Sequence, residues 1–310
     1  MRGENGQNIV YLEGTGGSGK STIAPRVAEA LAERGLKVCH VTLPAYHTPT
    51  GVILKESLAG RYGYIPKGGL GLLFTLNRLE IAPYLEAGLD SDWSFVIERS
   101  HVSNALSIPE STGVGVSALI NLRNQYPKQY EEILNEEFAN LRKQDRRFLS
   151  LEEGVSTTKI FLDTGVYAAI KSREERRAEG ETKHDIWEKG EEQRLRQEIL
   201  VKMIKWEGNW EVVERTGTPS DTFNLVWEKV LANVPFFGQE NSEAKVKRPV
   251  MDFNYLTQEY FPEISIEGIR RSLMTIADSE TGLRTSQLTR KLDGVLQPRL
   301  QFLPPEKERR

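Results

Sequence analysis

The stretch from Glu13 to Thr22, EGTGGSGKST, follows a short apolar run and matches the pattern G-x-x-x-x-G-K-[ST]. Glycines at these positions let backbone N–H groups turn toward phosphate oxygens, and the dipole of a following helix attracts the same negative charge. We therefore expect a phosphate-binding loop between a strand and a helix, with ATP as its ligand. The residues of this loop are Gly14, Thr15, Gly16, Gly17, Ser18, Gly19, Lys20, Ser21 and Thr22.

Two side chains of the loop carry the expected chemistry. The ammonium group of Lys20 is expected to reach the terminal phosphates, and the hydroxyl of Ser21 is expected to bind Mg²⁺. The four histidines show no metal-ligand spacing and one cysteine cannot build a zinc site, so Mg²⁺ is the only metal that the sequence implies.

Five short runs rich in β-branched residues alternate with longer segments of helical pattern. This alternation favours an α/β protein with a parallel sheet flanked by helices, which together with the loop predicts the P-loop NTPase fold. Ser220 or Asp221 is expected to cap the last helix of this unit. The runs lie at 8–14, 37–44, 94–100, 157–163 and 209–217, and helices are expected at 21–34, 70–88, 126–147, 185–206 and 221–233.

The alternation of strand-like and helix-like segments stops after the last of these helices. We expect a P-loop domain over residues 1–235, a polar, proline-flanked linker over 236–248, and a small, mainly helical extension over 249–310. A helical appendage on the main domain or on a second subunit is one interpretation of the extension. A small helix-turn-helix-like module is the other.

Composition limits the possible partners. The net charge of −3 over 310 residues gives no global basic field, so nucleic acid is not favoured as the main partner. No apolar stretch reaches the roughly 18 residues of a membrane span, and the N-terminus lacks the apolar region of a signal peptide. We expect a cytoplasmic protein that binds a small nucleotide, and a homodimer remains open.

A second pattern lies downstream of the loop. The segment LLFTLNR carries Phe74, Asn77 and Arg78, and the next predicted strand ends in Glu98 and Arg99. Over about residues 8–234 the chain resembles the thymidylate kinase family, whose pattern runs LLF-x-x-[DN]-R and then D-R-Y/H. The tripeptide ERS that begins at Glu98 is also similar to the deoxynucleoside kinase family.

The resemblance to thymidylate kinases implies roles for these side chains. Phe74 looks like the aromatic residue on which the acceptor base stacks, and Arg78 like the arginine that holds the acceptor phosphate. Arg99 is similar to the arginine of the D-R-Y motif, and Glu98 takes the place of its carboxylate, near Mg²⁺ or the acceptor. The substrate-binding set that follows is Phe74, Asn77, Arg78, Arg99, Tyr46 and Ser103, and the metal set is Ser21 and Glu98.

An arginine-rich segment after the fourth run resembles the lid of nucleoside monophosphate kinases, where arginines neutralise the transferring phosphoryl group. The segment RTGTPSD, from Arg215, is placed where this family closes on the adenine of ATP. The catalytic set implied by the resemblance is Lys20, Glu98, Arg99, Arg173, Arg176 and Arg177.

Two positions depart from the family pattern. Gly16 stands where the family usually has an acid, and Tyr46 stands where an arginine contacts both phosphates. Tyrosine carries no charge, so either the lid arginines compensate, the acceptor differs from thymidylate, or transfer is weak. His47 could supply a cation if neighbouring phosphates raised its pKa. A charged insertion over 111–156 is expected to cover the acceptor site or to form an oligomer contact.

The sequence therefore leaves three functions open. The first is ATP- and Mg²⁺-dependent transfer of a phosphoryl group to a pyrimidine deoxynucleoside monophosphate, as in thymidylate kinases. The second is a deoxynucleoside kinase, in which Glu98 or another carboxylate would act as the base toward a 5′-hydroxyl. The third is an ATP-binding regulatory protein with degenerate kinase activity.

Overall fold

The computed structural model describes residues 7–60, 69–112, 115–165, 190–215, 217–234 and 250–253. All of these residues belong to the first of two compact units, Met1–Pro262. Arg173, Arg176 and Arg177, the linker over 236–248 and residues 254–310 lie outside the described residues. The structure therefore does not test the predictions for the lid or for most of the C-terminal extension.

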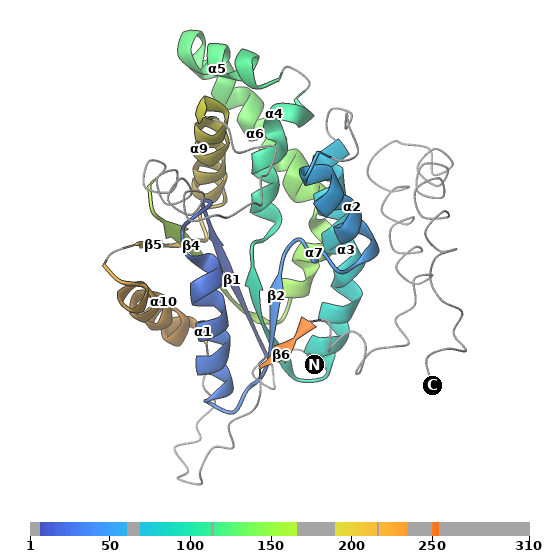
Figure 1. Ribbon diagram of the computed structural model, residues 1–310, viewed down its shortest axis with the longest axis vertical. Helices are drawn as coiled ribbons and strands as arrows, with labels where there is room; N and C mark the ends of the chain where they lie inside the picture. Colours follow the sequence, from blue (N-terminus) through green and yellow to red (C-terminus); the bar gives the residue numbers. More distant parts are fainter. Residues whose placement is uncertain are drawn as a thin grey trace, which may run out of the picture. The chain divides into compact units, whose positions relative to one another are not determined.

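A parallel β-sheet forms the centre of the described part, in the strand order β5-β4-β1-β3-β2-β6 (Figure 1). Every residue of β1 and β3 is buried, as expected for strands covered on both faces. The predicted α/β fold is confirmed. The strands are β1 (Asn8–Gly14), β2 (Lys37–Thr42), β3 (Trp93–Glu98), β4 (Ser156–Asp163), β5 (Glu211–Glu214) and β6 (Met251–Asp252).

Helices cover the two faces of this sheet. The described α-helices are α1 (Lys20–Ala32), α2 (Pro49–Leu58), α3 (Gly69–Asp90), α4 (Ile108–Ser111), α5 (Val116–Gln125), α6 (Pro127–Gln144), α7 (Arg146–Leu149), α9 (Gly190–Glu207) and α10 (Pro219–Asn233). Two 3₁₀ segments, η1 (His101–Ser107) and η2 (Ser150–Glu152), complete the described part. None of the helices described is long and apolar enough to cross a membrane.

Alternate residues of β3 face opposite layers. Val96 belongs to the apolar cluster that α1 and α10 form on one face of the sheet. Phe95 points to the other face, where its ring lies so close to Gly88 of α3 that a Cβ atom there would approach it to 2.5 Å. Glycine at position 88 therefore allows α3 to pack directly on the sheet.

The predicted helix boundaries need three corrections. The segment 126–147 forms two helices, α6 and α7, which meet at Asp145. Helix α10 begins at Pro219, and its N-cap is Thr218, whereas Ser220 or Asp221 was predicted. Asp221 instead accepts a hydrogen bond from the Thr218 backbone, which completes a capping box. Helices α2, α4 and α5 had not been predicted.

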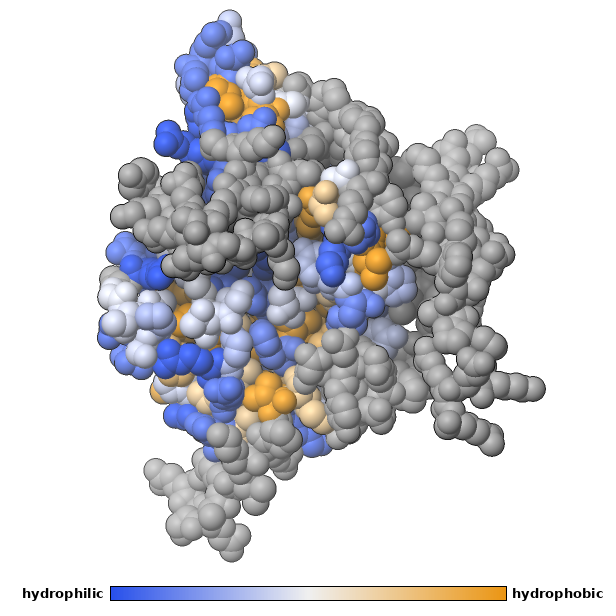
Figure 2. Space-filling model, in the orientation of Figure 1, coloured by the Kyte–Doolittle hydropathy of each residue, from blue (hydrophilic) through white to orange (hydrophobic). Residues whose placement is uncertain are grey.

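The charged insertion is built on an amphipathic helix. In α6 the buried residues are spaced three or four positions apart and so form one apolar stripe along the helix. They are Tyr130, Leu134, Phe138 and Leu141. The helix packs against η1 and α9. On the face shown in Figure 2, the region of α5 is mainly hydrophilic, as the charged sequence requires.

The chain returns to the sheet shortly after the predicted linker. Strand β6 pairs in parallel with β2, at Cys39 and His40. The ring of Phe253 then packs against those of His47 and Tyr84, with centroids 5.7 Å and 6.2 Å away. These residues fall within the predicted extension, whose boundary stays a prediction.

Candidate active site

The phosphate-binding loop connects β1 to α1, as the sequence predicts. Gly19 is the N-cap of α1 with a φ of 92°, and Gly17 has a φ of 84°, values in the left-handed region that favours glycine. The Gly19 carbonyl accepts the first helical bond, from Ile23. The loop thus leaves the amides of the first turn of α1 directed toward its centre, where the helix dipole favours an anion.

Lys20 lies over the loop. Its Nζ atom donates to the carbonyl oxygens of Gly14 and Thr15 at 2.6 Å and 2.9 Å, and the residue is only 4% exposed. A phosphate bound by the loop amides would compete with these carbonyls for the ammonium group. The position fits the predicted role of Lys20 toward the terminal phosphates.

The two predicted magnesium ligands meet at the start of α1. The hydroxyl of Ser21 donates to Oε1 of Glu98, at the end of β3, over 2.7 Å. Among the described residues no group of three or more His, Cys, Asp or Glu side chains could hold a metal. One hydroxyl, one carboxylate and phosphate oxygens form a donor set that suits Mg²⁺, which usually keeps several waters and needs few protein ligands.

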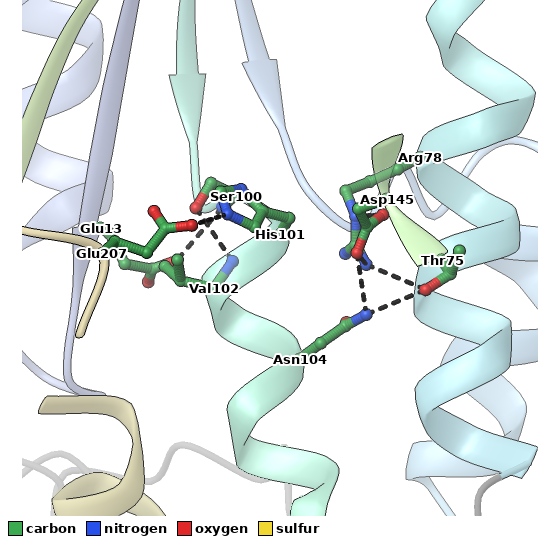
Figure 3. A network of polar contacts seen from close by, with 9 residues as sticks. All are labelled: Glu13, Thr75, Arg78, Ser100, His101, Val102, Asn104, Asp145 and Glu207. Carbon is green, nitrogen blue, oxygen red and sulfur yellow. Dashed lines mark hydrogen bonds and ion pairs between the residues drawn. The ribbon is translucent and has the colours of Figure 1, made fainter. Parts of the chain in front are cut away.

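Glu13 organises the junction between the loop and the next strand, and no role had been predicted for it. Its side chain is fully buried, and Oε1 accepts from the Gly14 amide. Oε2 accepts from the Ser100 amide at 3.1 Å (Figure 3). It also accepts from the Ser103 hydroxyl at 2.6 Å. A carboxylate at the end of an otherwise apolar strand was the sequence signal for this role.

Arg99 occupies the turn that follows β3. It has a φ of 73°, which is uncommon for a residue with a side chain, and its amide donates to the Leu12 carbonyl at 2.8 Å. The turn directs the Arg99 side chain into the cavity that also reaches the phosphate loop.

A single cavity joins the loop to the predicted acceptor site. All six residues predicted to bind substrate line this cavity, although their roles toward a ligand stay predictions. Its lining consists of Thr15, Gly16, Leu43, Pro44, Tyr46, Leu58, Phe74, Asn77, Arg78, Arg99, Ser100, Ser103, Leu106, Gln193, Arg196, Gln197 and Leu200.

Arg78 is paired inside the protein. Its Nε and Nη2 atoms donate to the two carboxylate oxygens of Asp145 at 2.7 Å and 2.8 Å, and both side chains are almost fully buried. Asn104 of η1 donates to Asp145 and to Thr75 (Figure 3). Asp145 therefore neutralises most of the charge that Arg78 would offer to a phosphate. No sequence pattern predicted this pair, because 67 positions separate its members.

Asn77 fixes the loop that carries Tyr46. Its Oδ1 atom accepts from the Ala45 amide at 2.8 Å, and its Nδ2 atom donates to the hydroxyls of Thr48 and Thr50 at 2.9 Å and 3.0 Å. These bonds indicate a positioning role for Asn77. Tyr46 projects from this loop and is 41% exposed.

Buried Glu80 supports the same loop one turn along α3. Its Oε2 atom accepts from the amide of Thr50 at 3.1 Å and also from the Thr50 hydroxyl. Burial raises the pKa of Glu80, and the hydrogen bonds from threonine hydroxyls and amides oppose that rise.

His47 points away from the acceptor cavity. It lines a neighbouring cavity with His40, Lys55 and Phe253, and its ring packs on Phe253. The expectation that His47 replaces the missing arginine therefore finds no support in its position.

A buried ion pair anchors α9, which forms one wall of the acceptor cavity. The Nε2 atom of His101 and Oε1 of Glu207 lie 2.6 Å apart (Figure 3). Trp210 also donates to this carboxylate. Burial by itself would raise the pKa of Glu207, but the hydrogen bond and charge of His101, with smaller contributions from Trp210 and Lys159, lower it to about 2.

Arg215 is a further cation on the donor side. It follows β5 in the segment predicted to close on adenine, and its Nη1 atom donates to the carbonyl of Gly17 at 3.1 Å. This contact places the segment beside the phosphate loop.

Comparison with known proteins agrees with this geometry. Residues 12–147, which include the loop, the helix of Phe74 and the strand of Glu98, match the family model described as thymidylate kinase. Over these residues the chain is similar to thymidylate kinases. The predicted family resemblance is confirmed for the region that carries its motifs.

Two individual proteins are also similar to this chain. A putative thymidylate kinase of Invertebrate iridescent virus 6 is 26% identical over 123 residues, which are 40% of this chain and 53% of the viral protein. The chain thus matches about half the length of this curated relative. The solved thymidylate kinase of Candida albicans is 18% identical, with a TM-score of 0.48, over 73% of this chain and 92% of that one.

Proposed function

We propose that the protein transfers the γ-phosphoryl group of ATP to a pyrimidine deoxynucleoside monophosphate, such as dTMP, and so forms the diphosphate. The observation that carries this proposal is the shared cavity, which is lined both by the phosphate loop at Thr15 and Gly16 and by Phe74, Arg78 and Arg99. A donor bound at the loop and an acceptor bound near Phe74 would meet without intervening protein.

The donor is held by the loop amides and by Lys20, which lies over the loop carbonyls. Ser21 and Glu98 would hold Mg²⁺, which supplies charge neutralisation on the phosphates. In the transfer, a phosphate oxygen of the acceptor forms a bond to the γ-phosphorus while the bond to the β–γ bridging oxygen breaks. The protein contributes positioning and charge, because this reaction needs little covalent help.

The acceptor base is expected to stack on Phe74, and Arg99 is expected to bind the acceptor phosphate. Arg78 is less suited to the phosphate than the sequence implied, because Asp145 already accepts two of its hydrogen bonds. Arg173, Arg176 and Arg177 remain the candidates for neutralising the moving phosphoryl group. We also expect a cytoplasmic location, and a homodimer stays a prediction.

A panel of acceptors tests the proposal. Purified protein is incubated with ATP, Mg²⁺ and, separately, dTMP, dUMP, dCMP, thymidine and deoxycytidine, and ADP formation is followed. We expect turnover with a pyrimidine monophosphate and none with the nucleosides. A Lys20→Met variant prepared in the same way controls for contaminating kinases.

A deoxynucleoside kinase is the second candidate, and the weak positive charge around the acceptor favours it. Arg78 is paired with Asp145, and Tyr46 is uncharged. Turnover with nucleosides alone would establish this function and overturn the first. Tight ATP binding without turnover of any acceptor would favour an ATP-binding regulatory protein.

A further inference from the structure

The loop that follows β2 separates two cavities. Pro44 and Tyr46 line the acceptor cavity, and both also line the neighbouring cavity, which contains His47 and Lys55. The loop is thus a wall that the two cavities share. Any shift of this loop changes the shape of the acceptor cavity.

Helix α3 holds the loop through hydrogen bonds to its backbone. The side chain of Asn77 accepts from the amide of Ala45 at 2.8 Å, and that of Glu80 accepts from the amide of Thr50 at 3.1 Å. These bonds fix the backbone at two points, and residues 46–49 lie between them. The contacts of these intervening residues decide how tightly the centre of the loop is held.

Phe253 reaches the centre of the loop from a segment far along the chain. Strand β6 pairs in parallel with β2, where Asp252 lies opposite His40, so the residue after β6 lies near the end of β2 at which the loop begins (Figure 1). Phe253 is only 3% exposed. Its ring meets those of His47 and Tyr84 edge to face, with centroids 5.7 Å and 6.2 Å away, a favourable arrangement for aromatic rings.

Tyr84 connects this aromatic contact to α3. It follows Glu80 by four positions, so the two side chains project from the same side of the helix. Glu80 bonds the loop at Thr50, and Phe253 packs between Tyr84 and His47. Phe253 therefore adds an attachment between α3 and the centre of the loop to the hydrogen bonds on either side.

We propose that Phe253 is a positioning residue of the acceptor site, which holds His47 and so keeps Tyr46 in the wall of the acceptor cavity. A loop that is ordered before binding loses less conformational entropy when the acceptor binds. The donor site should not respond, because β3 lies between β2 and the strand that carries the phosphate loop, β1. This inference rests on the proposed function and extends its acceptor site to the segment after the predicted linker.

Hydrogen exchange of the free, full-length protein tests whether Phe253 holds the loop. Mass spectrometry follows amide exchange over residues 43–50 in the wild type, Phe253→Ala and Phe253→Tyr. We expect exchange to be about 10-fold faster in the alanine variant and unchanged in the tyrosine variant, which keeps the ring. Val250→Ala is the matched control, because Val250 belongs to the same segment but packs against the apolar cluster of α1 and α10.

Calorimetric titration with dTMP and with ADP tests the consequence for the acceptor. Phe253→Ala should bind dTMP about 10-fold more weakly and ADP as tightly as the wild type does. His47→Ala removes the partner ring from an exposed position and should give the same loss, even where Phe253→Ala folds poorly. The double variant should lose no more than either single variant, because both remove one contact. Val250→Ala should lower the unfolding temperature without changing the affinity for dTMP.

Three results would overturn the inference. The first is wild-type exchange over residues 43–50 in Phe253→Ala. The second is an equal loss of dTMP and ADP affinity, which indicates a general loss of structure. The third is unchanged dTMP affinity in both Phe253→Ala and His47→Ala.

Failure of the proposed function would look different. The exchange measurement contains no nucleotide, so it decides whether Phe253 holds the loop whichever acceptor the wild type uses. If the wild type phosphorylates thymidine and not dTMP, the proposed function fails, and thymidine replaces dTMP in the titration. A wild type that phosphorylates dTMP, with variants that keep its affinity, contradicts the inference and leaves the proposed function standing.

Discussion

On the donor side of the cavity, Lys20 contacts carbonyl oxygens five and six positions away in its own loop. On the acceptor side, Arg78 depends on Asp145, 67 positions away, and His101 depends on Glu207, 106 positions away. The donor side is thus built mainly from one continuous stretch, and the acceptor side from segments that packing brings together. Substitutions on the donor side should therefore affect catalysis with little loss of stability, and those on the acceptor side should affect both.

The largest effect is expected for Asp145→Ala. This change leaves the buried guanidinium of Arg78 without its partner, and breaking such a pair lowers the free energy of unfolding by about 3–5 kcal/mol. Urea denaturation measures the loss, with Glu132→Ala on the exposed side of α6 as the control. An apolar pair, Arg78→Met with Asp145→Leu, should lose less than Asp145→Ala. Equal stability of Asp145→Ala and the wild type would show that the pair contributes nothing.

Lys20→Met tests the donor side. We expect kcat to fall about 10²- to 10³-fold, because a positive charge at the phosphates is lost, with an unchanged circular dichroism spectrum. Initial rates at saturating ATP measure the effect, and Lys205→Met, on an exposed position of α9, is the control. A variant that keeps a tenth or more of the activity would contradict the role of Lys20. A variant that unfolds would contradict the local character of the donor side.

Glu207→Gln tests the anchor of α9 through pH. The pKa of Glu207 is about 2 in the folded protein against an ordinary 4.5, so the carboxylate stabilises the fold above pH 4.5, and this contribution is lost as pH falls toward 2. Its full size corresponds to roughly 3 kcal/mol. The glutamine variant should be less stable at neutral pH and should lose less on acidification than the wild type. Urea midpoints at several pH values between 2 and 6 measure the difference, and identical slopes would contradict the prediction.

Tyr46→Arg is expected to have the smallest effect and to strengthen the acceptor side. The new guanidinium should tighten dTMP binding about 10-fold through a charge-assisted hydrogen bond, and thymidine binding should not change. Tyr46 is 41% exposed, so the fold should tolerate the larger side chain. Calorimetric titration compares the two ligands, with Tyr46→Phe to separate loss of the hydroxyl from gain of charge. A gain for thymidine as well would show that the arginine does not act on the phosphate.

The sequence was sufficient for five of the six described strands and for the phosphate loop, because both depend on short-range patterns. Periodicity located four of the five predicted helices to within a few residues of at least one of their ends. The loop motif predicted that Lys20 and Ser21 lie where the loop meets the helix, and α1 begins at Lys20. The periodicity of apolar residues did not reveal α2 and α5, because their apolar residues are few or not arranged in a clear stripe.

The candidate site was predictable in its lining and not in its partners. The six predicted substrate residues share one cavity because family motifs preserve side chains that face a ligand. Asp145 and Glu13 were missed, since each acquires its role from a tertiary contact. Asp145 lies in the charged run RKQDRR, which is otherwise typical of an exposed surface, whereas the carboxylate of Glu13 at the end of an apolar strand was a usable signal.

The backbone of Arg99 places stability and activity in competition at one position. A left-handed φ of 73° costs a residue with a side chain about 1 kcal/mol, a cost that glycine does not carry. Selection for a more stable protein alone would therefore favour Arg99→Gly, and the same change would remove the only strand-end guanidinium proposed to hold the acceptor phosphate. A screen for thermostable variants that ignores turnover should enrich this substitution, and a screen that requires turnover should reject it.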